Sequence, residues 1–151
     1  MTEVRVSPAE VEVAAAEVTA VRAAATDPVR RDLLEELLGS LERGSVGADQ
    51  AVVLEGIVDL GLHTGRIRAL HGPGGESAAL RLHRRLPTGA AAVASCAETS
   101  AALSALAGRE LEGVAVDATG PGRYTLTLTA GGRTLSVRLD RNVARLASVE
   151  A

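Results

Sequence analysis

The hydrophobic periodicity of this 151-residue chain changes once, near Arg109, and that change restricts the folds the chain can adopt. Before Arg109 apolar residues recur at helical spacing; after it they alternate with polar residues, most regularly in segment 123–130. A period of 3.6 indicates helices, whereas a period of two indicates strands with one buried face. The pattern predicts an α+β fold, in which an N-terminal bundle of about four helices precedes a further helix and a C-terminal four-stranded antiparallel meander.

Local signals set the expected element boundaries. Ser7 and Glu10 have the spacing of a capping box, and Asp27 followed by Pro28 is a second helix start. Gly56 and Gly61 fall inside a predicted helix, where glycine is unfavourable, so we expect them to permit close packing. Helices are predicted over about 7–25, 27–43, 48–63, 76–86 and 95–107. Strands are predicted over about 111–118, 123–130, 133–140 and 143–151, residues 1–6 are a candidate edge strand, and turns are expected at 119–122, 131–132 and 140–142.

Segment 66–86 allows two interpretations. Its centre, Gly72-Pro73-Gly74-Gly75, is a turn in either. The residues after the turn form either a helix that Pro87 closes, or a strand paired with 66–71 in a hairpin. The helix is favoured, because this segment lacks the β-branched residues that strands prefer.

The length suits a single domain over residues 1–151, divided into a mainly helical half, 7–87, and a helix-plus-sheet half, 95–151. We expect one face of the sheet to be solvated and the other to be covered by the helix or by the bundle. The chain has no Phe or Trp, so its core must be aliphatic. Cys96 is the only cysteine, which excludes an intrachain disulfide.

Charge is segregated along the chain. Residues 1–62 carry twelve acids and five arginines, residues 63–90 carry one acid and five arginines, and residues 91–151 carry six of each. The resulting charges of −7, +4 and 0 predict docking between the first two segments, within one molecule or between molecules. A net charge of −3 and a single aromatic residue argue against a nucleic-acid partner.

The use of arginine without any lysine is typical of GC-rich bacterial coding. No long apolar run or signal-peptide pattern is present, which predicts a cytoplasmic protein without a membrane partner.

Two sets of residues are candidate sites. Glu55, Asp59 and His63 stand four apart and share one helix face, where carboxylates and imidazole suit acid–base or metal chemistry. The alternative is a polar helix edge paired with an arginine such as Arg66, and no metal or cofactor is predicted. The second set would bind an anion at the glycine turn, where backbone N–H groups and arginines are expected to converge. Its members are Gly74, Gly75, Ser77, Arg81 and Arg84.

The charge segregation and the open edges of the meander favour a non-catalytic interaction or assembly module, accessory or self-associating, with a homo-oligomer as the expected state. One alternative is a protein that binds a small phosphate or carboxylate ligand at the glycine turn. A less favoured alternative is a small enzyme that uses His63 with Asp59 and Glu55.

Overall fold

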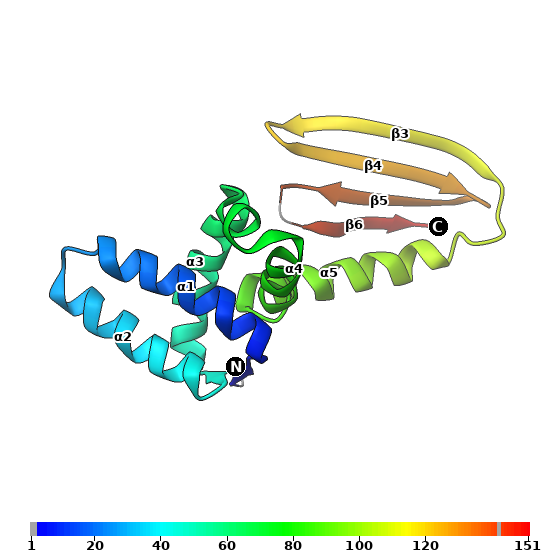
Figure 1. The fold of residues 1–151 in the computed structure, drawn as a ribbon. Coiled ribbons are helices and arrows are strands. Elements are labelled where there is room, and N and C mark those ends of the chain that lie inside the picture. The colour runs from blue at the N-terminus through cyan, green and yellow to red at the C-terminus, as the bar shows by residue number, and fades with distance from the viewer. Residues whose placement is uncertain (1–2, 142) are drawn as a thin grey trace. The chain divides into compact units, whose positions relative to one another are not determined.

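A computed structural model of the protein describes residues 3–141 and 143–151 (Figure 1). Five helices precede a four-stranded antiparallel sheet, which confirms the α+β prediction. The elements are β1 (Val4–Arg5), α1 (Pro8–Ala24), α2 (Pro28–Glu42), β2 (Ser45–Val46), α3 (Ala48–His63), α4 (Arg66–His83), α5 (Pro87–Ser104), β3 (Leu111–Gly120), β4 (Arg123–Ala130), β5 (Arg133–Leu139) and β6 (Ala144–Glu150).

The chain forms two compact units, Met1–Ala90 and Ala91–Ala151, called here the helical unit and the sheet unit. Residues 1 and 2 of the predicted edge strand, and Asn142 of a predicted turn, lie outside the described residues. The rest of that edge strand is β1, which pairs antiparallel with β2 in a segment predicted as a loop. No described helix is long and apolar enough to cross a membrane.

The helical unit has an aliphatic core. Its largest fully buried side chains come from α2, α3, α4 and the turn after α4: Leu34, Leu37, Leu41, Leu54, Ile67, Leu82 and Leu86. The apolar stripes are narrower than the sequence pattern suggests, because Val29, Leu33, Val52 and Leu60 are exposed. The predicted capping box at the start of α1 is present, and the Ser7 amide donates to Glu10 Oε2 at 2.8 Å.

Segment 66–83 is helical on both sides of a break. Gly72 has a φ of 67°, which glycine tolerates and other residues rarely adopt, and Pro73 starts the second half. The hairpin alternative is therefore wrong, and the second half begins three residues earlier than predicted. An ion pair between Arg68 and Glu76, at 3.0 Å, spans the break.

The prediction that the next helix begins near residue 95 was wrong, because α5 begins at Pro87. Proline fits the first turn of a helix, where its missing N–H would have no intrahelical partner. The carboxylate of Glu55, 33 residues earlier in the chain, accepts hydrogen bonds from the next two amides, Thr88 and Gly89, at 2.8 and 3.0 Å. The alanine-rich segment after Pro87 is therefore helical.

The sheet unit holds the strands in sequence order, β3-β4-β5-β6, all antiparallel (Figure 1). Directly paired residues lie on the same face, and the register sorts the residues into an apolar face and a polar face. The apolar face has three rows across the strands: Val114, Leu128, Leu135 and Val149; Val116, Leu126, Val137 and Leu146; Ala118, Tyr124, Leu139 and Ala144.

A register shift in β6 keeps both of its large apolar side chains on that face. Ser136 pairs with Ser148 while the next residue of β5, Val137, pairs with Leu146, so Ala147 has no opposite residue. Without this β-bulge, Leu146 and Val149 would point to opposite faces, because they are three residues apart.

Candidate functional site

Glu55 has a structural role in this fold. Its side chain is buried, and Oε1 accepts the hydrogen bonds that cap the start of α5. A carboxylate at a helix N-terminus satisfies free amides and interacts favourably with the helix dipole. Glu55 thus contacts backbone amides, whereas Asp59 and His63 lie farther along α3.

Asp59 and His63 form a polar cluster with a histidine of α4. The Oδ1 atom of Asp59 lies 3.2 Å from His63 Nδ1 and 3.6 Å from His83 Nε2. His63 is 71% exposed, and its Nδ1 is also 3.0 Å from the Asp59 carbonyl oxygen. Among the described residues no group of three or more His, Cys, Asp or Glu side chains could hold a metal ion. The spacing of Asp59 and His63 predicted their contact, but only the packing of α4 brings in His83.

The glycines of the predicted anion site border a pocket of the helical unit. This pocket has a volume of about 350 Å³ and lies between α1 and α4; its lining is Ala9, Glu12, Val13, Leu70, His71, Gly74, Gly75 and Ala78. A side chain at Gly75 would overlap Cβ of His71, so this position requires glycine. The His71 Nε2 atom is buried without a hydrogen-bond partner in the described part of the chain.

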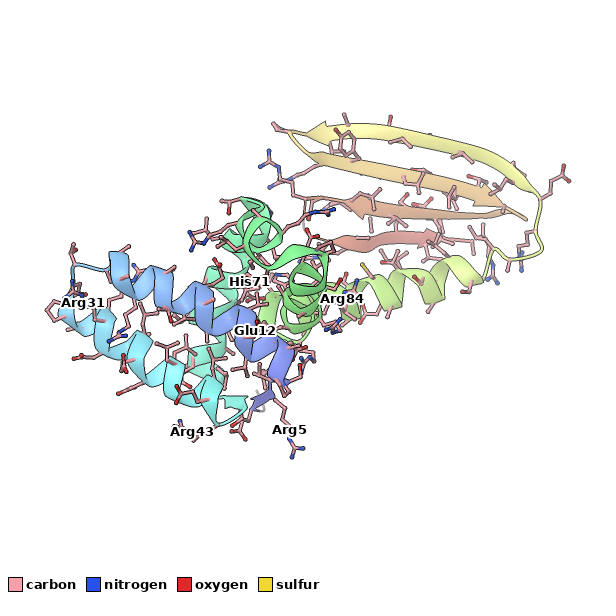
Figure 2. All side chains as sticks on the ribbon, viewed as in Figure 1. Arg5, Glu12, Arg31, Arg43, His71 and Arg84 are labelled. Atoms are coloured by element: carbon pink, nitrogen blue, oxygen red, sulfur yellow. The ribbon has the colours of Figure 1, made fainter. Side chains whose placement is uncertain are left out.

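The structure does not bring the predicted arginines to these glycines. Arg81 and Arg84 follow Gly75 by six and nine residues, roughly 9 and 14 Å along a helix axis. Arg84 is the residue that follows the last residue of α4, whereas Glu12 and His71 both line the pocket; Figure 2 labels all three side chains. Ser77 is exposed and is not part of the lining. The charged lining residue is an acid, Glu12.

Two arginines of the basic segment pair with buried acids of α1. Arg66 Nε lies 3.2 Å from Glu17 Oε2, and Arg85 Nη2 lies 2.5 Å from Glu10 Oε2. Burial opposes ionisation of Glu10, but hydrogen bonds from Arg85 and Ser7 outweigh it and lower the pKa of this carboxyl. The contrast between the acidic and basic segments is thus used, in part, for docking within the helical unit.

The apolar face of the sheet unit is only partly covered. Leu106, which follows α5, packs with Ala130 and Leu135 in a small buried cluster, and Val137 is also buried. The side nearest β3 is open, because Val114, Val116 and Tyr124 are all about half exposed or more. We call these three residues the β3 patch. The prediction that this face would be covered therefore holds for its centre and fails at β3.

The two outer strands of the sheet differ in what occupies their free edges. On β6 the hydroxyl groups of Ser95 and Thr99, both from α5, donate to the carbonyl of Ala144 at 2.8 and 3.3 Å. On β3 no second strand pairs with the outer edge among the described residues, and the whole strand up to Thr119 is exposed. The β3 edge with its patch is the surface of this chain best suited to bind another protein strand.

The chain was compared with known proteins, and no protein-family model, curated protein or solved structure matches it.

Proposed function

We propose that this chain is a non-catalytic assembly module that associates with a second copy of itself through β3. The observation that carries the proposal is the exposure of two valines, Val114 and Val116, at the centre of a ten-residue edge strand. Edge strands are usually protected by charges, prolines or bulges, because their free N–H and C=O groups bind other strands. In β3 the irregularities lie toward the two ends, and the segment Val114-Ala115-Val116 has no such protection.

A second copy is the occupant that suits the charges of β3. Antiparallel pairing about a two-fold axis at Ala115 places Val114 of each copy opposite Val116 of the other, on one continuous apolar face. The same register places Asp117 opposite Gly113, and Glu112 opposite Ala118, so no acid faces an acid. Pairing about residue 117 would instead oppose the two Asp117 carboxylates, which is unfavourable.

Symmetric pairing also ends at a dimer. The β3 edge of each copy is used once, and the remaining outer strand, β6, has α5 hydroxyl groups bonded to its Ala144 carbonyl. An isologous contact of this kind closes, whereas joining β3 to β6 of the next copy would propagate into a filament.

Light scattering coupled to size exclusion tests the proposal. At about 100 μM, where an interface with a micromolar Kd is largely formed, the expected mass is twice the chain mass of 15.4 kDa. Val116→Lys places a charge in the β3 patch and should give the monomer mass. Val29→Lys, the same substitution at a more exposed valine of α2, is the matched control and should remain a dimer. A monomeric wild type, or a Val116→Lys variant that remains dimeric, would contradict the proposal.

A further inference from the structure

Three arginines from three consecutive strands line one pocket of the sheet unit. Arg123 comes from β4, Arg138 from β5 and Arg145 from β6. The pocket has a volume of about 520 Å³, and its lining is completed by Thr119, Asp140, Leu146 and Ala147. The three arginines lie near the ends of their strands, and their side chains are on the polar face of the sheet, which is the face opposite the β3 patch.

Two of these arginines face each other directly. Arg138 pairs with Arg145 in the β5–β6 register, so their Cβ atoms are roughly 4.5–5.5 Å apart on one face. Like charges placed directly opposite each other destabilise a sheet. The same row continues through Thr125 to Asp117 on β3, which places the nearest acid in the row two strands away from Arg138.

The pocket arginines differ from three arginines of the helical unit's basic segment, residues 63–90. Arg66, Arg68 and Arg85 each form an ion pair with a glutamate. Within residues 3–141 and 143–151, no ion pair or hydrogen bond joins the side chains of Arg123, Arg138 or Arg145 to another side chain. The carboxylate among the lining residues, Asp140, accepts a hydrogen bond from the amide of Val143 at 3.0 Å.

We propose that this pocket binds a phosphate dianion, either free or as the phosphate group of a small phosphomonoester. Three guanidinium groups against one carboxylate leave a charge of +2, which a phosphate dianion neutralises. Guanidinium groups bind phosphate oxygens through paired N–H donors, and the dianion relieves the repulsion between Arg138 and Arg145. Thr119 supplies a hydroxyl donor.

A small ligand suits this pocket better than a nucleic acid. Single-stranded nucleic acids need aromatic side chains for their bases to stack on. The single aromatic residue, Tyr124, lies on the opposite, apolar face of the sheet, and the chain has a net charge of −3. The pocket therefore provides charge for one phosphate group without a surface that would track a polymer.

An NMR titration of the full chain with inorganic phosphate, and then with phenyl phosphate, tests the assignment at constant ionic strength. The expected result for both ligands is saturable shifts of β5 and β6 amides. Arg138→Gln and Arg145→Gln should each weaken binding by roughly tenfold, since each removes charge-assisted hydrogen bonds. Arg133→Gln, an exposed arginine at the other end of β5, is the matched control and should bind as the wild type does.

Three results would overturn the assignment: shifts that sodium chloride reproduces, equal weakening in the Arg133→Gln control, or tighter binding of a single-stranded oligonucleotide than of phenyl phosphate. Tighter binding of phenyl phosphate than of inorganic phosphate would identify an ester as the ligand, whereas equal binding would identify the phosphate group alone. A thermal-shift measurement gives an independent readout. In the absence of phosphate, Arg138→Gln should have a higher melting temperature than the wild type, and added phosphate should stabilise the wild type but not the variant. A lower melting temperature without phosphate would contradict the repulsion on which the proposal depends.

Discussion

The guanidinium group of Arg85 lies 2.5 Å from the buried carboxylate of Glu10, and Arg85 also donates to the carbonyl of Arg5 at 2.5 Å. The side chain of Arg85, which follows α4, thus binds both the strand β1 and the first turn of α1. Removal of the arginine leaves a buried carboxylate with one backbone donor from the capping box. Losing one partner of a buried pair costs more than the net value of the pair.

Arg85→Ala should therefore lower the free energy of unfolding by about 1–3 kcal/mol. Arg84→Ala is the matched control, because Arg84 is exposed and should change stability by less than about 0.5 kcal/mol. Urea denaturation of both variants measures the difference. Equal effects of the two substitutions would show that the Glu10 contact does not stabilise the fold.

The Glu10 carboxyl should also make stability depend on pH. Its pKa in the folded chain is lower than the ordinary value of 4.5, because hydrogen bonds from Arg85 and Ser7 favour the charged form. A lowered folded pKa gives stability that is fully present above pH 4.5 and is lost as the pH falls through the folded pKa. Denaturation of wild type and Glu10→Gln between pH 6 and pH 3 should show a difference that shrinks below pH 4.5. A difference independent of pH would contradict this role.

Glu55 should behave as a helix cap. Glu55→Ala should lower stability by about 1 kcal/mol, the usual effect of losing an N-terminal cap. Glu55→Gln retains an oxygen acceptor for Thr88 and Gly89 and should lose less. Thermal denaturation of both variants, with exposed Glu36→Ala as control, tests this order. A Glu55→Gln variant as unstable as Glu55→Ala would show that charge, and not the acceptor, is what α5 requires.

Two glycines of α3 give opposite predictions for the same substitution. A Cβ at Gly61 would lie 2.8 Å from Ile67 Cδ1, and Ile67 is fully buried. Gly61→Ala should therefore destabilise the protein by about 1–3 kcal/mol. A Cβ at Gly56 meets nothing within 4 Å, so Gly56→Ala should stabilise by roughly 0.5–1 kcal/mol through helix propensity. Calorimetry of both variants checks the signs, and a destabilising Gly56→Ala would contradict the packing described for α3.

Features decided by neighbouring residues could be predicted from the sequence. The capping box of Ser7 and Glu10 and the two-residue hairpin at Gly131-Gly132, where both glycines have positive φ, lie where the local pattern placed them. The packing role predicted for two glycines is confirmed for Gly61 and wrong for Gly56, because periodicity alone does not show which helix face has a neighbour.

Features decided by distant residues could not be predicted. The start of α5 is capped by Glu55, a residue of α3 that is 33 positions from Thr88 in the sequence and is brought beside it by the packing of the helices. The pairing of Arg138 with Arg145 on the face opposite Val149 requires the β-bulge at Ala147, since alternation without it would place Arg145 and Val149 on the same face. The predicted anion site also lies in the basic segment, residues 63–90, where the structure pairs Arg66, Arg68 and Arg85 with acids.

The most direct test of the assembly proposal is a disulfide between two copies at the proposed two-fold axis. In a Cys96→Ala background, Ala115→Cys should cross-link under mild oxidation, because directly opposite residues of antiparallel strands are roughly 4.5–5.5 Å apart between Cα atoms, within disulfide range. Asp117→Cys in the same background should not, because its two copies would be four residues out of register. Rapid dimer formation by Ala115→Cys alone is the predicted result on non-reducing electrophoresis. No cross-link at 115, or equal cross-linking at 115 and 117, would contradict pairing of β3 with β3 about Ala115.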